Sequence, residues 1–213
     1  MRYQFLSAKQ LRAPIPEEYE AHGTLIVMPF IDAARAQEAA RQLTLRANAD
    51  GLLLCVHDDE REGFVSIANQ AFAMSSHERV GYVAQDAFAG RHWLRMALDV
   101  FATRKPGLLA FNDGKWLGEL ASFGLVDRRW ALGNYGGPLF HPGYRSHYAD
   151  VELTLLARHA GRYAYEANAV LVEIDAEKDV KPVSEQDRDL FLSRRQSGFE
   201  GRVKDTALLE KFQ

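Results

Sequence analysis

Blocks of apolar residues alternate with helical patterns along the first half of the chain. Short continuous apolar runs predict strands at 24–28, 52–56, 80–84 and 108–111. Between them, apolar residues recur at helical spacing, which predicts helices at 33–48, about 63–75 and about 93–101. Continuous apolar runs are typical of strands that are covered on both faces. The alternation therefore predicts an α/β fold, with a mostly parallel central sheet and helices on both faces.

The second half of the chain has a different pattern. Residues 112–147 are rich in Gly, Asn, Pro and aromatic residues, so loops and short elements are expected. Later elements are expected as a helix at about 147–160, strands at 163–166 and 170–174, and a last helix at about 184–195. Ser184 and Asp187 have the spacing of a helix N-terminal cap, and Arg194 is expected on a solvated face of that helix.

These patterns divide the chain into three parts. Residues 1–22 are polar, contain two prolines and are expected to form an N-terminal arm. Residues 23–175 are expected to form the folded domain, and 176–213 a charged tail with one helix. The first 23 residues hold no apolar stretch of signal-peptide length, and no segment approaches the roughly 20 apolar residues of a membrane span. We therefore expect a cytoplasmic protein without a membrane anchor.

Composition narrows the possible functions. The chain is 47% hydrophobic, which is enough to fill a core, and its 26 basic and 29 acidic residues give a formal net charge of -3. This balance does not support bulk attraction to nucleic acid or to membranes. The single cysteine, Cys55, lies inside an apolar run and is expected to be a buried core residue without a disulfide partner.

Acidic residues follow three consecutive predicted strands. Asp32 follows the first strand, residues 58–60 follow the second, and Asp86 follows the third. Asp and Glu also favour turns and helix caps, which is the simpler explanation for each of them taken alone. Ligands of open parallel sheets bind beyond the carboxyl ends of the strands. Three acids at that edge therefore favour a ligand site.

In order and spacing, these motifs resemble the inverting family-two glycosyltransferases, which have the GT-A fold. The resemblance covers about residues 23–175 and rests on the segments 28–32, 56–59, 82–86 with Trp93 and Leu94, 123–130 and 148–153. It implies hexosyl transfer from a nucleotide-sugar, with uridine as the nucleoside, by single displacement with inversion. It implies that the donor is bound by Pro29, Phe30, Asp32, Asp58, Asp59, Asn69, Gln85 and Asp86.

The resemblance also implies a divalent metal. Asp86 stands at the second acid of the Asp-x-Asp motif of the family, which holds Mn²⁺ or Mg²⁺ against the diphosphate. Ala84 stands where the first acid is expected, and Ala68 replaces the Arg that usually precedes Asn69. A single carboxylate can hold the cation when phosphates and waters complete the shell.

On the acceptor side, the resemblance implies that Asp150 is the catalytic base. A helix N-terminus favours the ionised form of an acid, which suits a group that must take the proton of an attacking hydroxyl. Residues that could contact the sugar or the acceptor are Asn112, Asp113, Trp130, Gly136 and Glu152. The identity of the acceptor stays open: a glycan, a lipid-linked sugar, a protein and modified DNA are all compatible with the sequence. The sequence also leaves the oligomeric state open.

Three alternatives remain at this point. A degenerate GT-A domain would bind a nucleotide or a partner without catalysis, and Ala84 favours that alternative. A sugar nucleotidyltransferase would need a Gly-rich first loop with basic residues, which 28–32 lacks. The third is an α/β domain with a purely structural role.

Overall fold

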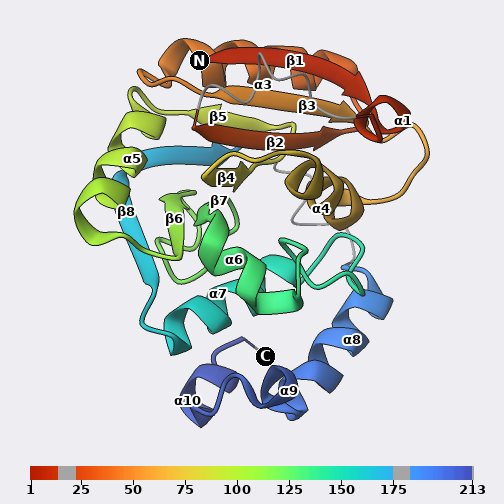
Figure 1. The fold of residues 1–213 in the computed structure, drawn as a ribbon, viewed down its shortest axis with the longest axis vertical. Helices are drawn as coiled ribbons and strands as arrows, with labels where there is room; N and C mark the ends of the chain where they lie inside the picture. Colours follow the sequence, from red (N-terminus) through yellow and green to blue (C-terminus); the bar gives the residue numbers. More distant parts are fainter. Residues whose placement is uncertain (14–22, 175–182, 213) are drawn as a thin grey trace.

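The computed structural model describes residues 1–13, 23–174 and 183–212. Within them, eight strands form one sheet in the order β1-β3-β2-β4-β7-β6-β8-β5 (Figure 1). The strands are β1 (Arg2–Ser7), β2 (Thr24–Phe30), β3 (Leu52–His57), β4 (Arg79–Tyr82), β5 (Ala87–Ala89), β6 (Leu108–Asn112), β7 (Gly124–Asp127) and β8 (Tyr163–Glu173). The expected α/β class is confirmed. The boundaries expected near 22 and 175 adjoin segments outside the described residues, so the domain division stays a prediction.

Most neighbouring strands run parallel. The pairs β1–β3, β3–β2, β2–β4 and β6–β8 are parallel, whereas β7 is antiparallel to both β4 and β6, and β5 is antiparallel to β8. Strands β1, β2, β3, β4, β6 and β8 therefore share one direction, and their carboxyl ends lie along the same edge of the sheet.

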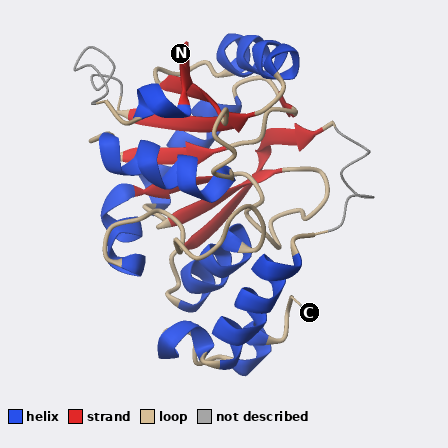
Figure 2. Cartoon of the chain, turned by 90° about the vertical axis from the view of Figure 1, so that its right-hand side faces the viewer, coloured by secondary structure: helices blue, strands red, loops and turns tan. Residues whose placement is uncertain are grey.

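Helices pack on both faces of the sheet (Figures 1 and 2). They are α1 (Ala8–Leu11), α3 (Ala33–Arg46), α4 (Phe64–Met74), α5 (Trp93–Arg104), α6 (Arg128–Tyr135), α7 (Ala149–His159), α8 (Glu185–Gln196), α9 (Gly198–Gly201) and α10 (Thr206–Leu209). One core cluster joins the sheet to α4, α6, α7 and α8, and the other joins it to α3 and α5. No helix among the described residues has the length and apolar character of a bilayer span.

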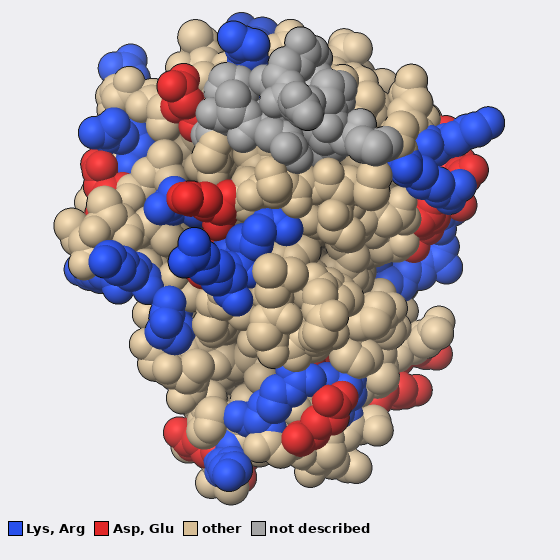
Figure 3. Space-filling model, viewed as in Figure 1, with Lys and Arg blue, Asp and Glu red and all other residues tan. Residues whose placement is uncertain are grey.

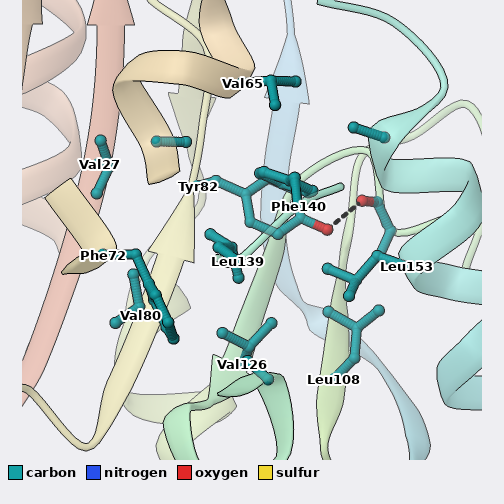
Figure 4. Close-up of a cluster of buried hydrophobic side chains, with 14 of the residues drawn as sticks. Val27, Val65, Phe72, Val80, Tyr82, Leu108, Val126, Leu139, Phe140 and Leu153 are labelled. Carbon is teal, nitrogen blue, oxygen red and sulfur yellow. Dashed lines mark hydrogen bonds between the residues drawn. The ribbon is translucent and has the colours of Figure 1, made fainter. Parts of the chain in front are cut away.

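The two core clusters explain the continuous apolar runs. Along β3, Leu52, Leu54 and Val56 belong to one cluster, while Leu53 and Cys55 belong to the other, because successive side chains point to opposite faces. Cys55 is fully buried, as the sequence predicted, and burial raises the pKa of its thiol to about 12. Figure 4 shows part of the first cluster, in which the rings of Tyr82 and Phe140 lie edge to face, 4.9 Å apart.

The N-terminal residues add a strand that the sequence pattern did not predict. Strand β1 pairs in parallel with β3 and forms one edge of the sheet. Ser7 then caps the short helix α1, and the N–H of Ala8 donates to Asp59 at 3.2 Å. The first residues of the expected arm are therefore part of the sheet.

The face drawn in Figure 3 carries charged side chains of both signs. On the face in Figure 3, Asp and Glu lie among the Lys and Arg side chains, with uncharged surface between them. The presence of both signs on this face agrees with the near balance of 26 basic and 29 acidic residues in the chain.

Gly63 lies where two loops approach closely. Its φ is 94°, and a Cβ built on it would stand 2.7 Å from the carbonyl oxygen of Arg145. That carbonyl accepts the N–H of Val65 and so caps the start of α4. We expect Gly63→Ala to lower the free energy of unfolding by about 1–3 kcal/mol, because it adds backbone strain and a clash. Urea titration measures this loss.

Gly133 provides the matched control. It lies within α6 and a Cβ built there meets no atom within 4 Å. Gly133→Ala should therefore leave stability unchanged or raise it by about 0.5–1 kcal/mol, since Ala is the better helix former. Equal effects of the two substitutions would contradict the strain assigned to Gly63.

Candidate functional site

The candidate site lies at the carboxyl edge of the sheet, where β2, β3, β4, β6 and β8 end. The final residues of β2, β3, β4, β6 and β8 are Phe30, His57, Tyr82, Asn112 and Glu173. The ends of these strands and the loops that follow them carry most of the residues that the sequence singled out. Topology therefore brings them to one edge of the sheet, where α/β proteins bind ligands.

Gln85 joins the loops that follow β2 and β4. Its side-chain oxygen accepts the N–H groups of Ile31 and Asp32 at 2.8 and 2.9 Å. The carboxylate of Asp32 accepts two N–H groups at the start of α3, so this acid is the helix cap. Pro29 is buried in β2, and the ring of Phe30 stacks on that of His57 at 5.1 Å.

The two acids after β3 already bind backbone groups. Asp58 is buried, and its carboxylate accepts the N–H groups of Glu62 and Gly63 at 2.7 and 3.0 Å. Asp59 holds the N-terminus of α1 through Ala8. Both acids lie at the expected edge, and both help to shape the loop between β3 and α4.

The side chain of Asn69 is directed toward the segment that contains Phe140. Its side-chain amide makes two hydrogen bonds with the backbone of Phe140, one as donor at 3.0 Å and one as acceptor at 2.8 Å. This side chain also lines a cavity of about 620 Å³ between α4 and the segment 137–142. The amide thus anchors the segment that contains Phe140.

Asp86 lies in the loop between β4 and β5 and is 5% exposed. Its carbonyl oxygen accepts the N–H of Ile174, and the next residue, Ala87, pairs with Glu173 across the β5–β8 ladder. With Gln85 and residues of α3, Asp86 lines a cavity of about 200 Å³. The backbones of Asp86 and Glu173 thus lie side by side, although 87 positions separate the two residues in sequence.

Asp113 follows β6 and closes a tight loop. One carboxylate oxygen accepts the N–H groups of Lys115 and Trp116 at 3.0 and 2.7 Å, and the other accepts the hydroxyl of Ser122. Asn112 likewise binds Ala167 and Gly114 through its side chain. Both side chains are held firmly at the carboxyl edge.

Asp150 lies in the first turn of α7 and is half-buried. Burial raises the pKa of its carboxyl to about 6, two backbone hydrogen bonds oppose that rise, and the carboxylates of Asp113 and Glu173 add to it. Among the described residues, Asp150 forms no ion pair with a basic side chain, and Arg158 instead binds the carbonyls of Gly118 and Glu119. An acid with this pKa that is not bound to a cation can act as a general base near neutral pH.

Two expected substrate contacts do not fit this geometry. Trp130 packs against Gly107 at the amino end of β6, which is the opposite edge of the sheet. Glu152 is fully buried and binds the guanidinium of Arg194 through both carboxylate oxygens, each at 2.8 Å. Trp130 therefore has a packing contact, and Glu152 is held in a buried ion pair. Gly136 ends α6 in a left-handed conformation, with φ 72°.

The contacts of α8 with α7 and with the loop before it were not predicted from sequence. Arg194 was expected on a solvated face, but this side chain is 10% exposed and pairs with Glu152 and Glu200. Asp187 was expected only as a capping-box residue, yet its carboxylate accepts three consecutive N–H groups from 145–147. The contacts with Glu152 and with 145–147 join positions about 40 residues apart, and local periodicity carries no signal for them.

Comparisons with known proteins agree with this architecture. No protein-family model and no curated protein sequence match the chain. Solved structures do match it. Residues 1–349 of TarS from S. aureus superpose with a TM-score of 0.57 at 11% identity, over 89% of this chain and 70% of that one. The mannosyltransferase PcManGT from Pyrobaculum calidifontis, in complex with GDP-Man and Mn²⁺, gives 0.57 at 16% identity, over 89% and 66%.

A third structure covers more of both chains. Glucosyl-3-phosphoglycerate synthase from Mycobacterium tuberculosis, in complex with Mg²⁺ and UDP, gives a TM-score of 0.60 at 12% identity, over 91% of this chain and 86% of that one. Identities this low establish the fold alone. Since these structures are GT-A glycosyltransferases, the fold that the sequence resemblance implied is confirmed.

Proposed function

We propose that this chain, which has the GT-A glycosyltransferase fold, transfers a sugar from a UDP-sugar to a hydroxyl acceptor by single displacement with inversion. The observation that carries the proposal is Asp150. It is a half-buried acid at a helix N-terminus with a pKa of about 6, next to other carboxylates at the carboxyl edge. The fold and the ligands of its structural neighbours support a nucleotide-sugar as the donor.

The donor nucleotide is proposed to lie across the ends of β2, β3 and β4, near Pro29, Asp59 and Asp86. Gln85 supports this placement because it ties the loops after β2 and β4 together. The stacked pair of Phe30 and His57 adds an aromatic surface beside them. The assignment of uridine rests on the resemblance of 56–59 to the family motif.

A divalent cation fits the donor side of this edge. Asp86, Asp113, Asp150 and Glu173 together would repel a diphosphate, and a cation held at Asp86 removes that repulsion. Oxygen ligands suit Mn²⁺ and Mg²⁺. Among the described residues, no three His, Cys, Asp or Glu side chains are grouped to hold a metal, so phosphates and waters would complete the shell. Bound there, the cation would neutralise charge on the departing diphosphate.

Asp150 would take the proton of the acceptor hydroxyl. As the hydroxyl oxygen attacks the anomeric carbon, the bond from that carbon to the diphosphate breaks, and the proton passes to the carboxylate. Attack from the side opposite the leaving group inverts the anomeric configuration. With a pKa near 6, the carboxylate is ionised at pH 7 and still basic enough to share the proton in the transition state.

The metal role of Asp86 can be tested directly. We expect Mn²⁺ to strengthen UDP binding to the native protein, and Asp86→Asn to abolish this strengthening without unfolding the chain. Calorimetry with UDP, with and without Mn²⁺, measures the effect. Asp50→Asn, a change of an exposed acid before β3, is the control. An unchanged metal effect in Asp86→Asn would exclude Asp86 as the ligand.

The proposed function itself is tested with a panel of nucleotide-sugars. A donor that binds only the folded chain raises the melting temperature of the protein. A transferase also hydrolyses its donor slowly, by transferring the sugar to water and releasing UDP. Binding without release of UDP would favour the alternative of a degenerate domain. Ala84 supports that alternative, because it stands where the first acid of the Asp-x-Asp motif is expected. The absence of both binding and release, with and without Mn²⁺, would contradict the proposal.

A further inference from the structure

The segment that leads into α7 is held by the C-terminal helix α8. The segment runs from Tyr144 to Glu152 and contains Asp150, the proposed base. In Figure 1, α8 lies at the end of the molecule away from β1, beside the loop that precedes α7. The contacts between them are polar, buried and short.

Asp187 provides the first of these contacts. Its side chain is 1% exposed, and its carboxylate accepts the N–H groups of Arg145, Ser146 and His147 at 2.8, 2.9 and 2.9 Å. Three consecutive N–H groups that converge on one anion form a backbone nest. Here the anion comes from α8, where the hydroxyl of Ser184 accepts the N–H of Asp187. The loop before α7 is thus fixed by a carboxylate about 40 residues away.

Arg194 provides the second contact. Its Nε and Nη2 donate to the two oxygens of Glu152, each at 2.8 Å, and the hydroxyl of Tyr144 donates to the same carboxylate. Glu152 lies in the first turn of α7, two residues beyond Asp150. Helix α8 therefore binds the segment on both sides of the proposed base, at 145–147 and at Glu152.

The segment is tied to the donor side as well. The carbonyl of Arg145 caps α4 through Val65, and the guanidinium of Arg145 donates to the carbonyl of Arg61 at 2.7 Å. The loop after β3 and helix α8 thus hold residue 145 from two directions. A shift of α8 would change the position of Asp150 relative to a donor bound at that loop.

We propose that Asp187 and Arg194 are positioning residues, which hold Asp150 at the distance from the donor that proton transfer requires. The inference rests on the proposed function. A general base works within about 2.6–3.2 Å of the proton it takes, and a misplacement of about 1 Å can cost 100-fold in rate. The contacts of α8 restrain the backbone on either side of Asp150, so they set this distance.

The test compares Asp187→Asn with Asp189→Asn, a change of an exposed acid on the same helix. UDP release is measured with UDP-glucose, UDP-galactose and UDP-N-acetylglucosamine in Mn²⁺, and UDP affinity by calorimetry. We expect Asp187→Asn to lower kcat by about 10- to 100-fold at unchanged UDP affinity, and Asp189→Asn to match the native protein. Hydrogen exchange should show faster exchange at the amides of 145–147 in Asp187→Asn alone.

A native kcat in Asp187→Asn, despite released amides, would overturn the inference. Losses of kcat and UDP affinity in parallel would also overturn it, because they indicate general damage. If Asp187→Asn does not fold, Arg194→Lys decides by the same measurements, since Lys keeps the charge but cannot match both carboxylate oxygens. If the native protein releases no UDP, the proposed function fails, while the exchange data still show whether α8 holds the segment.

Discussion

Asp150→Asn should slow sugar transfer by about 10²–10⁴-fold and leave donor affinity nearly unchanged. Asn fills the same space but cannot accept the proton of the acceptor hydroxyl. In the native protein, the acidic limb of kcat/KM should fall near pH 6, where the carboxyl becomes protonated. Steady-state UDP release across pH 5–8, together with UDP calorimetry, measures both quantities. Asp99→Asn, a change of an exposed acid on α5, should have no effect.

The same variant should gain stability at neutral pH. The folded-state pKa of Asp150 is raised from 3.8 to about 6, so between these values the folded chain binds more protons than the unfolded chain. Native stability therefore falls as pH rises through this window. Above pH 6 we expect Asp150→Asn to be more stable than the native protein by about 1–3 kcal/mol, and below pH 4 to show no gain.

Two outcomes would contradict this account of Asp150. A destabilised variant at pH 7.5 would give the carboxylate a structural role. A near-native rate of transfer would show that another group takes the proton. Thermal unfolding at pH 4 and pH 7.5 separates the stability effect from any effect on rate.

Arg194→Met should lower the free energy of unfolding by about 3–5 kcal/mol, because it leaves the fully buried carboxylate of Glu152 without its guanidinium partner. Urea denaturation measures the loss. Arg188→Met, a change of an exposed residue on the same helix, should stay within about 0.5 kcal/mol of the native protein.

The double variant Glu152→Met with Arg194→Met tests the cause. Replacing both members of a buried ion pair by apolar side chains is often neutral, so the double variant should be clearly more stable than Arg194→Met alone. If the two losses simply add, the stability of the region does not depend on the pairing of these charges.

Much of the sheet was predictable from sequence because burial on both faces leaves a clear pattern. The runs at 24–28, 52–56, 80–84 and 108–111 match β2, β3, β4 and β6 to within about two residues. Strand β8 was expected as two strands. It is one, with a register shift near Asn112 and with exposed residues at 167 and 168 that interrupt the apolar run.

Strands at edges and in antiparallel positions left less signal. Strand β1 is exposed along part of its length, so its polar residues resemble a flexible arm. Strand β7 has four residues and begins at Gly124, whose ideal Cβ would meet the hydroxyl of Tyr82. Short strands of this kind depend on their neighbours, which local sequence does not reveal.

The candidate site was predictable only as a location. The acids after successive strands do lie at one edge of the sheet, yet the carboxylates of Asp58 and Asp113 mostly bind backbone groups of their own loops. Asp is favoured in turns and caps for that same reason, so residue type cannot separate a cap from a ligand contact. The contact between Glu152 and Arg194 depends on how α8 folds back, which is tertiary information.

The rate at which the buried thiol of Cys55 reacts with a labelling reagent reports unfolding of the chain. With a pKa near 12 and no solvent contact, this thiol reacts with an alkylating reagent only when β3 separates from its neighbours. The chain has no second cysteine, so every labelling event reports the opening of the sheet at β3, between β1 and β2. Under native conditions, the labelling rate therefore measures how often the sheet opens at β3. A nucleotide-sugar bound at the carboxyl edge of the sheet should slow that rate, because it binds only the folded chain.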